Sequence, residues 1–314
     1  MSALSATNLP WPGGKRFAFS IFDDPDSQSQ ASSRQVYGFL RDLGLRATKG
    51  VWPLAPIRTA SDFGVTCADA DYLAWCLELQ RSGFEIGLHN VTSHTSTREE
   101  TAAGLEKFAQ KFGPAPITLA QHYFCEEAVY WGDQRVSDAV RLAYNFVTRF
   151  GNHGRFSGHR EGDPLFWGDL CRERVRYVRN FVFEEVNTLR ACAFFPYHDP
   201  ARPFVNYWYC STEGATVESF VNTLSEANQD RLEQDGGLCI MYVHFGHNFW
   251  DGTQLNPRFR QLMERLAKKN GWFAPVSQIL DFLRERNGNH VITDSERGAL
   301  ERRWLLHKLR FGGS

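Results

Sequence analysis

The stretch RFAFSIFDD at residues 16–24 decides the fold, because a mostly apolar run leads directly into two aspartates. Two later stretches follow the same pattern: FEIGL (84–88) leads into His89, and LCIMYV (238–243) leads into His244. Short apolar runs bounded by polar residues predict buried strands. In parallel α/β architecture the carboxyl ends of the strands meet at one rim. We therefore expect these three polar strand ends to lie together.

Amphipathic helical patterns alternate with the strands. The segments 32–44, 68–83 and 97–113 each show such a pattern and end at a glycine, a common helix stop. Alternation of this kind predicts parallel strands with helices outside. The segment 121–215 lacks clear helices and is rich in His, Gly, Pro and aromatic residues, which is typical of functional loops. Further strands are expected at 45–52, 116–120, 144–150, 191–195 and 272–276, and further helices at 217–237, 257–270, 277–286 and 294–310.

Composition excludes several classes of protein. Lys and Arg number 35 and Asp and Glu 36, so the net charge is −1. Proteins that bind nucleic acid or anionic membranes through their overall charge contain more Lys and Arg than Asp and Glu. This sequence has no such excess, although a local basic patch is not excluded. Residues are 42% hydrophobic and 14% aromatic, which supplies a sizeable core and excludes disorder.

The seven cysteines are odd in number and form no C-x-x-C pair. A disulfide framework or a zinc ribbon is therefore not expected, and we interpret the cysteines as small buried side chains in a reducing compartment. Residues 1–16 lack the basic start and apolar run of a signal peptide. No apolar run approaches the ~18 residues that span a bilayer. These features predict a cytoplasmic protein without a transmembrane segment.

The residue types at the rim suit a divalent metal. Zn²⁺ accepts carboxylate oxygen and imidazole nitrogen and keeps a position open for water. One Asp and two His would supply three ligands. The adjacent Asp points in a different direction at a strand end and can serve as a base, and a His across the rim can protonate a leaving group.

The order FDDPD, GFEIGLHNVTSH and a late YVH resembles the NodB-type polysaccharide deacetylases, carbohydrate esterase family four. FLRDLGLRATKGVW, between the first two motifs, is also similar, and the resemblance covers about 16–113 and 236–286. It implies an α/β fold, a distorted (β/α) barrel of about seven parallel strands, here with long irregular loops in the middle third. The roles that the resemblance implies are Asp23 as catalytic base, Asp24, His89 and His94 as metal ligands, and His244 as general acid.

Three departures from the family pattern affect the site. The two metal histidines are usually four residues apart, but His94 follows His89 by five, so the pair is expected on a loop. The third family motif usually carries an Arg that steadies the base; AQHYFCEEAVYWGD (120–133) has none, and His122 or Glu126 is expected to replace it. For the fourth motif, an Asp near a Trp, the candidates are Asp163 with Trp167 and Asp199 with Trp208, and Asp199 is preferred as partner of the acid.

Several other side chains, most of them in the middle region, are candidates either for binding substrate or for a structural role. His122, Trp131, Asp199 and His247 are the expected substrate-binding residues, since sugar rings stack on aromatic faces. Arg160, Arg179 and Arg202 are expected to form salt bridges in loops.

We expect one domain over residues 1–314, with the barrel at 15–290 and a helical tail at 291–314 that packs on the barrel or mediates a homo-oligomer. The predicted function is a metal-dependent hydrolase that removes an N-acyl group, acetyl in the first place, from a small, nucleotide-linked or lipid-linked amino sugar. The cofactor is a divalent metal, Zn²⁺ first, with Co²⁺, Ni²⁺ or Mn²⁺ as alternatives. Two other functions stay open: hydrolysis of a non-sugar amide or cyclic imide or ureide, and carbohydrate binding without catalysis.

Overall fold

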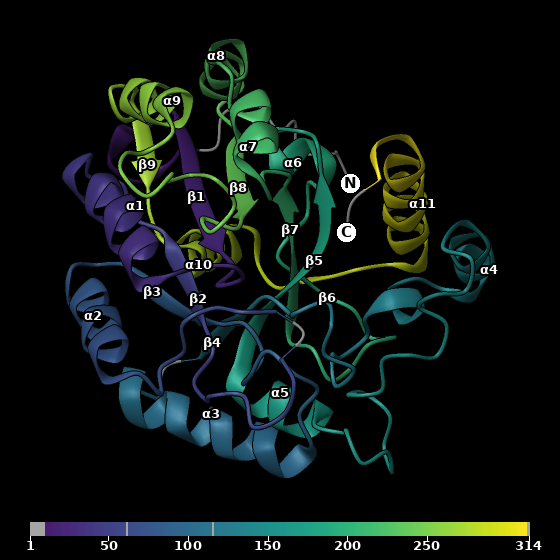
Figure 1. Ribbon diagram of the computed structural model, residues 1–314. Coiled ribbons are helices and arrows are strands. Elements are labelled where there is room, and N and C mark those ends of the chain that lie inside the picture. Colours follow the sequence, from purple (N-terminus) through teal and green to yellow (C-terminus); the bar gives the residue numbers. More distant parts are fainter. Residues whose placement is uncertain (1–9, 61, 115, 313–314) are drawn as a thin grey trace.

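A closed ring of seven parallel strands forms the centre of the computed structural model, which describes residues 10–60, 62–114 and 116–312 (Figure 1). The strand order is β1-β2-β3-β4-β5-β7-β8, and pairing of β8 with β1 closes the ring. The predicted distorted (β/α) barrel is thereby confirmed. The strands of the ring are Phe17–Asp23 (β1), Thr48–Val51 (β2), Glu85–Leu88 (β3), Ile117–Leu119 (β4), Val175–Phe183 (β5), Tyr207–Thr212 (β7) and Leu238–Val243 (β8).

Three short strands extend the sheet outside the ring. Gly271–Phe273 (β9) pairs with the first half of β1, below the point where β2 joins it. Tyr197–His198 (β6) runs antiparallel to β7, and His290–Val291 (β10) pairs with β6.

Helices surround the ring (Figure 1). Local signals fix several of their ends. Thr97 and Glu100 form a capping box at the start of α3, and Gly113, with φ of 100°, ends it in a conformation that favours glycine. The helices are Gln30–Asp42 (α1), Ala70–Arg81 (α2), Arg98–Phe112 (α3), Asp138–Val147 (α4), Gly168–Arg174 (α5), Thr188–Ala191 (α6), Val217–Thr223 (α7), Glu226–Gln234 (α8), Pro257–Ala267 (α9), Val276–Asn287 (α10) and Asp294–Phe311 (α11), with 3₁₀ turns at Pro12–Gly14 and Gly132–Arg135. None of the helices within the described ranges is long and apolar enough to cross a membrane.

The amino-terminal end of the barrel is sealed by the start of α10. The first backbone N–H groups of that helix have no partner within the helix. The N–H of Val276 donates to Thr48 Oγ1 (2.9 Å), and the N–H of Ser277 donates to a carboxyl oxygen of Glu85 (3.1 Å). Hydroxyls of Thr48 and Thr118 donate to the same buried carboxyl group. This seal directs any ligand to the opposite end of the barrel.

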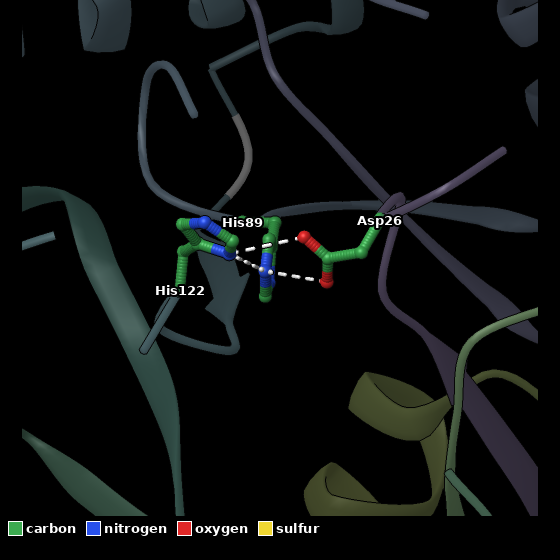
Figure 2. Close-up of side chains that lie close together, drawn as sticks. All are labelled: Asp26, His89 and His122. Atoms are coloured by element: carbon green, nitrogen blue, oxygen red, sulfur yellow. Dashed lines mark hydrogen bonds and ion pairs between the residues drawn. The ribbon is translucent and has the colours of Figure 1, made fainter. Parts of the chain in front are cut away.

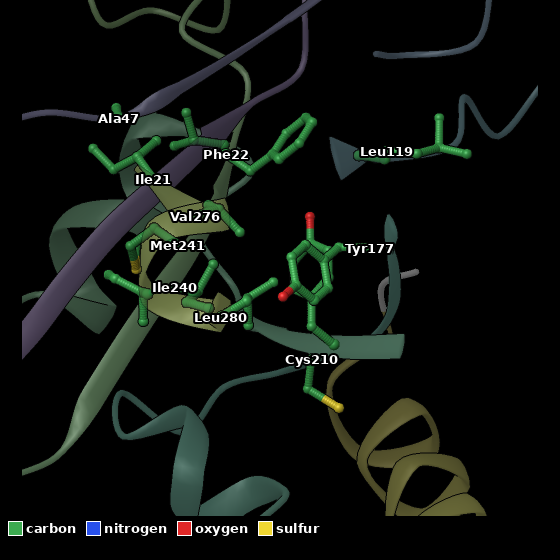
Figure 3. Close-up of a cluster of buried hydrophobic side chains, with 14 of the residues drawn as sticks. Ile21, Phe22, Ala47, Leu119, Tyr177, Cys210, Ile240, Met241, Val276 and Leu280 are labelled. Atoms are coloured by element: carbon green, nitrogen blue, oxygen red, sulfur yellow. The ribbon is translucent and has the colours of Figure 1, made fainter. Parts of the chain in front are cut away.

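Apolar side chains fill the barrel between the seal and the opposite rim (Figure 3). Phe22 and Ile240 come from neighbouring strands and are fully or almost fully buried. Val276 and Leu280 extend this cluster from α10.

The structure corrects several of the predicted elements. Residues 144–150, predicted as a strand, belong to the end of α4 and the following turn, and 191–195 form no strand. The helix predicted at 217–237 is two helices, separated at Leu224 and Ser225. β5 and β7 were not predicted. Both run through the region expected to be loops, and both are needed to close the ring.

Candidate functional site

The three polar strand ends named from the sequence lie at one rim, as expected. β1 leads into Asp24 and Asp26, β3 leads into His89, and β8 leads into His244. The loop after β4 adds His122. All of these residues are mostly buried, and all line one pocket of about 220 Å³.

One group of possible metal ligands at this rim is Asp26, His89 and His122 (Figure 2), and Asp24, Asp26 and His244 form a second that shares Asp26. His122 Nδ1 lies 3.0 Å from Asp26 Oδ1, and His89 Nε2 lies 3.3 Å from Asp26 Oδ2. The two imidazole nitrogens are 3.1 Å apart. Burial would raise the pKa of Asp26, but the charge of His89 and hydrogen bonds from His122 and His244 hold the pKa well below its usual range. The group therefore concentrates one anionic and two imidazole donors in a buried volume.

These donors fit a divalent metal. Donor atoms bound tetrahedrally about 2.0–2.1 Å from a zinc ion lie about 3.3 Å from one another. The two imidazole nitrogens, 3.1 Å apart, and the two Asp26 oxygens, 3.0 Å and 3.3 Å from one or the other of them, lie near that spacing, so the three side chains are close enough to share one ion. A set of one carboxylate and two imidazoles suits Zn²⁺ and similar transition metals.

Asp24 lies beside this group and is held by Arg179. The guanidinium donates two hydrogen bonds to the carboxylate, Nη1 to Oδ1 at 3.0 Å and Nη2 to Oδ2 at 2.6 Å. Both side chains are buried, and the guanidinium lies over the ring of Tyr242. Burial would lower the pKa of Arg179, but Asp24 raises it. Sequence reasoning placed Arg179 in a loop salt bridge; it stands instead on β5 and points into the site.

His244 flanks the acidic groups on the opposite side. Its Nε2 lies 3.1 Å from Asp26 Oδ2 and 3.9 Å from Asp24 Oδ2. Burial would lower the pKa of His244, but the hydrogen bond that its ring donates to Asp26 and the charge of Asp24 outweigh burial and raise the pKa. The ring of His247 packs on that of His244 at 4.8 Å between centroids, and His247 also lines the pocket.

Asp23 faces away from the pocket and is fully buried. Its Oδ1 accepts from Gln28 Nε2 (2.5 Å) and from the N–H of Phe245 (3.0 Å). Its Oδ2 accepts from Tyr37 Oη (3.0 Å) and pairs with Lys49 Nζ (3.1 Å). A carboxylate has about four acceptor positions, and all four are used. The sequence predicts Asp23 as the base, but in the structure none of its acceptor positions is free to take a proton from water.

His94 does not join the metal-binding group. Its Nε2 accepts from the backbone N–H of Ile57 (3.3 Å), and its Nδ1 lies 2.9 Å from the carbonyl oxygen of Thr95. Both ring nitrogens are thus engaged in holding the loop. His94 lies outside the group of Asp26, His89 and His122, and the second histidine of that group is His122, which was predicted to contact substrate.

The remaining predicted residues divide between the pocket and the structure around it. Trp131 lines the pocket, together with Tyr123 and Phe124, whose rings are 42% and 44% exposed at its opening. Asp199 was expected to orient His244, but it binds Arg202 and Arg297 instead, and His244 Nδ1 lies 3.2 Å from the carbonyl oxygen of Ala215.

Two residues of the site were not predicted from the sequence to belong to it. Asp26 stands in the quoted FDDPD motif, and a search for any third carboxylate near the strand end would have found it. Arg179 gave no such signal, because β5 itself was not recognised.

No protein-family model matches the sequence, and no curated protein sequence matches it. Solved structures do match. A putative polysaccharide deacetylase from Mycobacterium smegmatis superimposes with a TM-score of 0.52 and 14% identity, covering 91% of this chain and 97% of that one. The Xyl-CE4 domain of a multidomain xylanase from the hindgut metagenome of Trinervitermes trinervoides (TM-score 0.41, 14% identity, 90% and 98% covered) and a putative polysaccharide deacetylase involved in O-antigen biosynthesis from Bordetella bronchiseptica (0.38, 14%, 96% and 96%) are also similar. The first of these shows that the chain has the fold of a polysaccharide deacetylase, in a divergent form.

Proposed function

We propose that this protein is a metal-dependent hydrolase that removes an N-acyl group, acetyl in the first place, from an amino sugar. The observation that carries the proposal is the convergence of Asp26, His89 and His122 at the open end of the barrel, with Asp24 and His244 on either side. The structural similarity to the deacetylase from Mycobacterium smegmatis supports the same reaction class.

In this proposal Asp26, His89 and His122 hold Zn²⁺ or a similar ion. A bound metal of this kind lowers the pKa of water toward ~7 and polarises an acyl oxygen. Asp24 is the base that accepts the proton of the attacking water. Arg179 keeps its carboxylate oriented, the task that the family assigns to an Arg of the third motif. The missing Arg in residues 120–133 would by itself favour a relative without catalysis. In this proposal Arg179 orients the base from β5, so that argument against catalysis does not apply.

His244 is the general acid in this proposal. Its Nε2 lies at the rim within 3.9 Å of the carboxylates of both Asp24 and Asp26. From there it can donate a proton to the leaving nitrogen, a step worth roughly 10²–10⁴ in rate.

The opening of the pocket supports a sugar substrate. Tyr123 and Phe124 offer partly exposed aromatic faces on which the apolar side of a sugar ring can stack, and the buried Trp131 forms part of the pocket wall. The pocket volume of about 220 Å³ favours a small substrate or the end of a larger one over the middle of a polymer. A cytoplasmic location is part of the proposal and is supported by seven cysteines that are all buried and free.

The test measures acetate released from N-acetylglucosamine, from its nucleotide-linked form and from a chitin oligomer. Ring opening of a cyclic imide and of a hydantoin is measured in parallel for the non-sugar alternative. The protein is stripped of metal and reloaded in turn with Zn²⁺, Co²⁺, Ni²⁺ and Mn²⁺. Asp24→Asn should lose turnover by about 10³-fold or more while it keeps its metal. Asp42→Asn, an exposed change on α1, is the matched control. Turnover of the imide alone would move the assignment to the non-sugar class, and metal occupancy without any hydrolysis would favour a binding protein.

A further inference from the structure

Exposed apolar side chains gather on two helices far from the chain's first strands. Twelve large hydrophobic residues are exposed in the described part of the chain, and seven of them belong to α4, the turn after it, and the second half of α11. The seven are Leu142, Phe146, Val147, Phe150, Leu306, Leu309 and Phe311, with exposures from 37% to 78%. We call their combined surface the α4–α11 face.

The two helices are fixed to one another by their inner sides. The rings of Tyr144 on α4 and Trp304 on α11 stack at 5.5 Å between centroids. The buried carboxylate of Glu301 accepts hydrogen bonds from the backbone N–H and the hydroxyl of Ser137, just before α4. Figure 1 shows α4 and α11 beside each other at one edge of the barrel. The exposed residues therefore belong to a fixed part of the fold.

Charge is segregated on this face. Residues 139–155 and 302–312 together contain seven Arg and Lys and no Asp or Glu, in a chain whose net charge is −1. Some of these cations are engaged, since Arg141 pairs with Asp138 and Arg155 with Glu126. Among the described residues, Arg149, Arg302 and Arg310 have no carboxylate partner, and all three are exposed.

We propose that the α4–α11 face docks on an anionic phospholipid bilayer. Exposed Phe and Leu side chains beside unpaired arginines are the composition of helices that lie in a membrane interface, and each basic residue near an anionic leaflet adds attraction. A second copy of the chain fits less well, because a two-fold interface would bring the same arginines together. Nucleic acid would leave Leu142, Leu306 and Leu309 without a role.

The position of α11 connects this face to the catalytic pocket. His307 and Phe311, at the end of α11, line a second cavity of about 360 Å³. Val182 and Tyr242 form part of the wall of both this cavity and the catalytic pocket. A bilayer on the α4–α11 face would therefore lie next to a cavity that shares part of its wall with the pocket, a placement that suits a lipid-linked substrate. The docking itself does not depend on the proposed hydrolysis.

The experiment is co-flotation of the full chain with phosphatidylcholine vesicles, with or without 30 mol% phosphatidylglycerol, at 0.15 M salt. We expect at least ~10-fold tighter binding to the anionic vesicles. The double variants Phe146→Ser/Leu306→Ser and Arg149→Gln/Arg302→Gln should each weaken binding about 10-fold or more. Ile57→Ser and Arg81→Gln change exposed residues outside the face and should bind as the wild type does.

Two further readouts keep the result unambiguous. Thermal unfolding should be unchanged in all variants, because the altered side chains are exposed. Sedimentation velocity reports the oligomeric state without lipid. Equal or absent binding to both vesicle types overturns the proposal. A dimer that the Phe146→Ser/Leu306→Ser variant dissociates would instead assign the face to a second copy.

Discussion

Replacing Asp23 with asparagine separates the sequence-based role of this residue from the structural one. In the structure Asp23 accepts three hydrogen bonds, from Gln28, Tyr37 and the N–H of Phe245, and pairs with the fully buried Lys49. An asparagine would turn an N–H donor toward Lys49 or Tyr37 and leave the Lys49 ammonium without a counter-charge. Breaking a buried ion pair by removal of one partner costs about 3–5 kcal/mol.

The loss converts into a measurable shift of the melting temperature. A chain of 314 residues has an unfolding entropy of about 0.66 kcal/mol/K near 60 °C. We therefore expect Asp23→Asn to lower Tm by about 5–8 °C in scanning calorimetry. Asp42→Asn, exposed on α1, should leave Tm within about 1 °C. The double variant Asp23→Asn/Lys49→Met should recover part of the loss, because it removes the stranded charge.

Metal content and acetate release complete the assay. Turnover of Asp23→Asn should fall much less than that of Asp24→Asn when both are measured well below Tm. The reasoning would be refuted by a variant that melts with the wild type, retains its metal and has no turnover. That result would make Asp23 the base, as the sequence motif alone suggests.

Three other predictions address the metal, the pH response and the packing. His122→Ala should weaken zinc binding more than about 100-fold, beyond the usual effect of an outer-sphere partner, whereas His94→Ala should keep stoichiometric zinc by atomic absorption. Burial lowers the pKa of His159 to about 4 in the folded chain, whereas its pKa in the unfolded chain is ~6.5. The free energy of unfolding should therefore be constant above about pH 6.5 and be about 1–2 kcal/mol lower at pH 5. Urea unfolding at about pH 7 and at pH 5 should show this loss in the wild type and not in His159→Gln. Gly104→Ala should destabilise the fold by about 1–3 kcal/mol despite better helix propensity, since the new Cβ would lie 2.4 Å from Val91 Cβ; an equal or higher urea midpoint would contradict this.

The barrel was predictable from sequence where strands follow the simple pattern of buried parallel strands. β1, β3 and β8 are nearly continuous apolar runs, and the helices between the first strands carry clear caps. β5 was missed because VRYVRNFVF places Arg179 and Asn180 inside a buried strand. Those polar residues are tolerated there because Asp24 neutralises the arginine and Tyr197 accepts from Asn180. Local sequence does not contain that information.

The false strand at 144–150 has the opposite origin. Its apolar residues suggested a core strand, yet Phe146, Val147 and Phe150 are exposed on the α4–α11 face. In the site, sequence reasoning found the right strand ends but considered only two of the three neighbouring carboxylates, Asp23 and Asp24. Which of Asp23, Asp24 and Asp26 faces the pocket depends on Lys49 and Arg179, which come from other strands of the ring.

The seal made by α10 also bears on how the chain can fold during synthesis. The ring needs β8 between β1 and β7, and its lower end needs the N–H groups of Val276 and Ser277. Until β8 has left the ribosome, β1 and β7 present open parallel edges, and until about residue 280 has followed, the amino-terminal end of the barrel is uncovered. Open edges and exposed apolar surface invite wrong pairing. A chain that stops short of α10 would therefore expose apolar core, and one that stops short of β8 would also leave two strand edges free to pair wrongly.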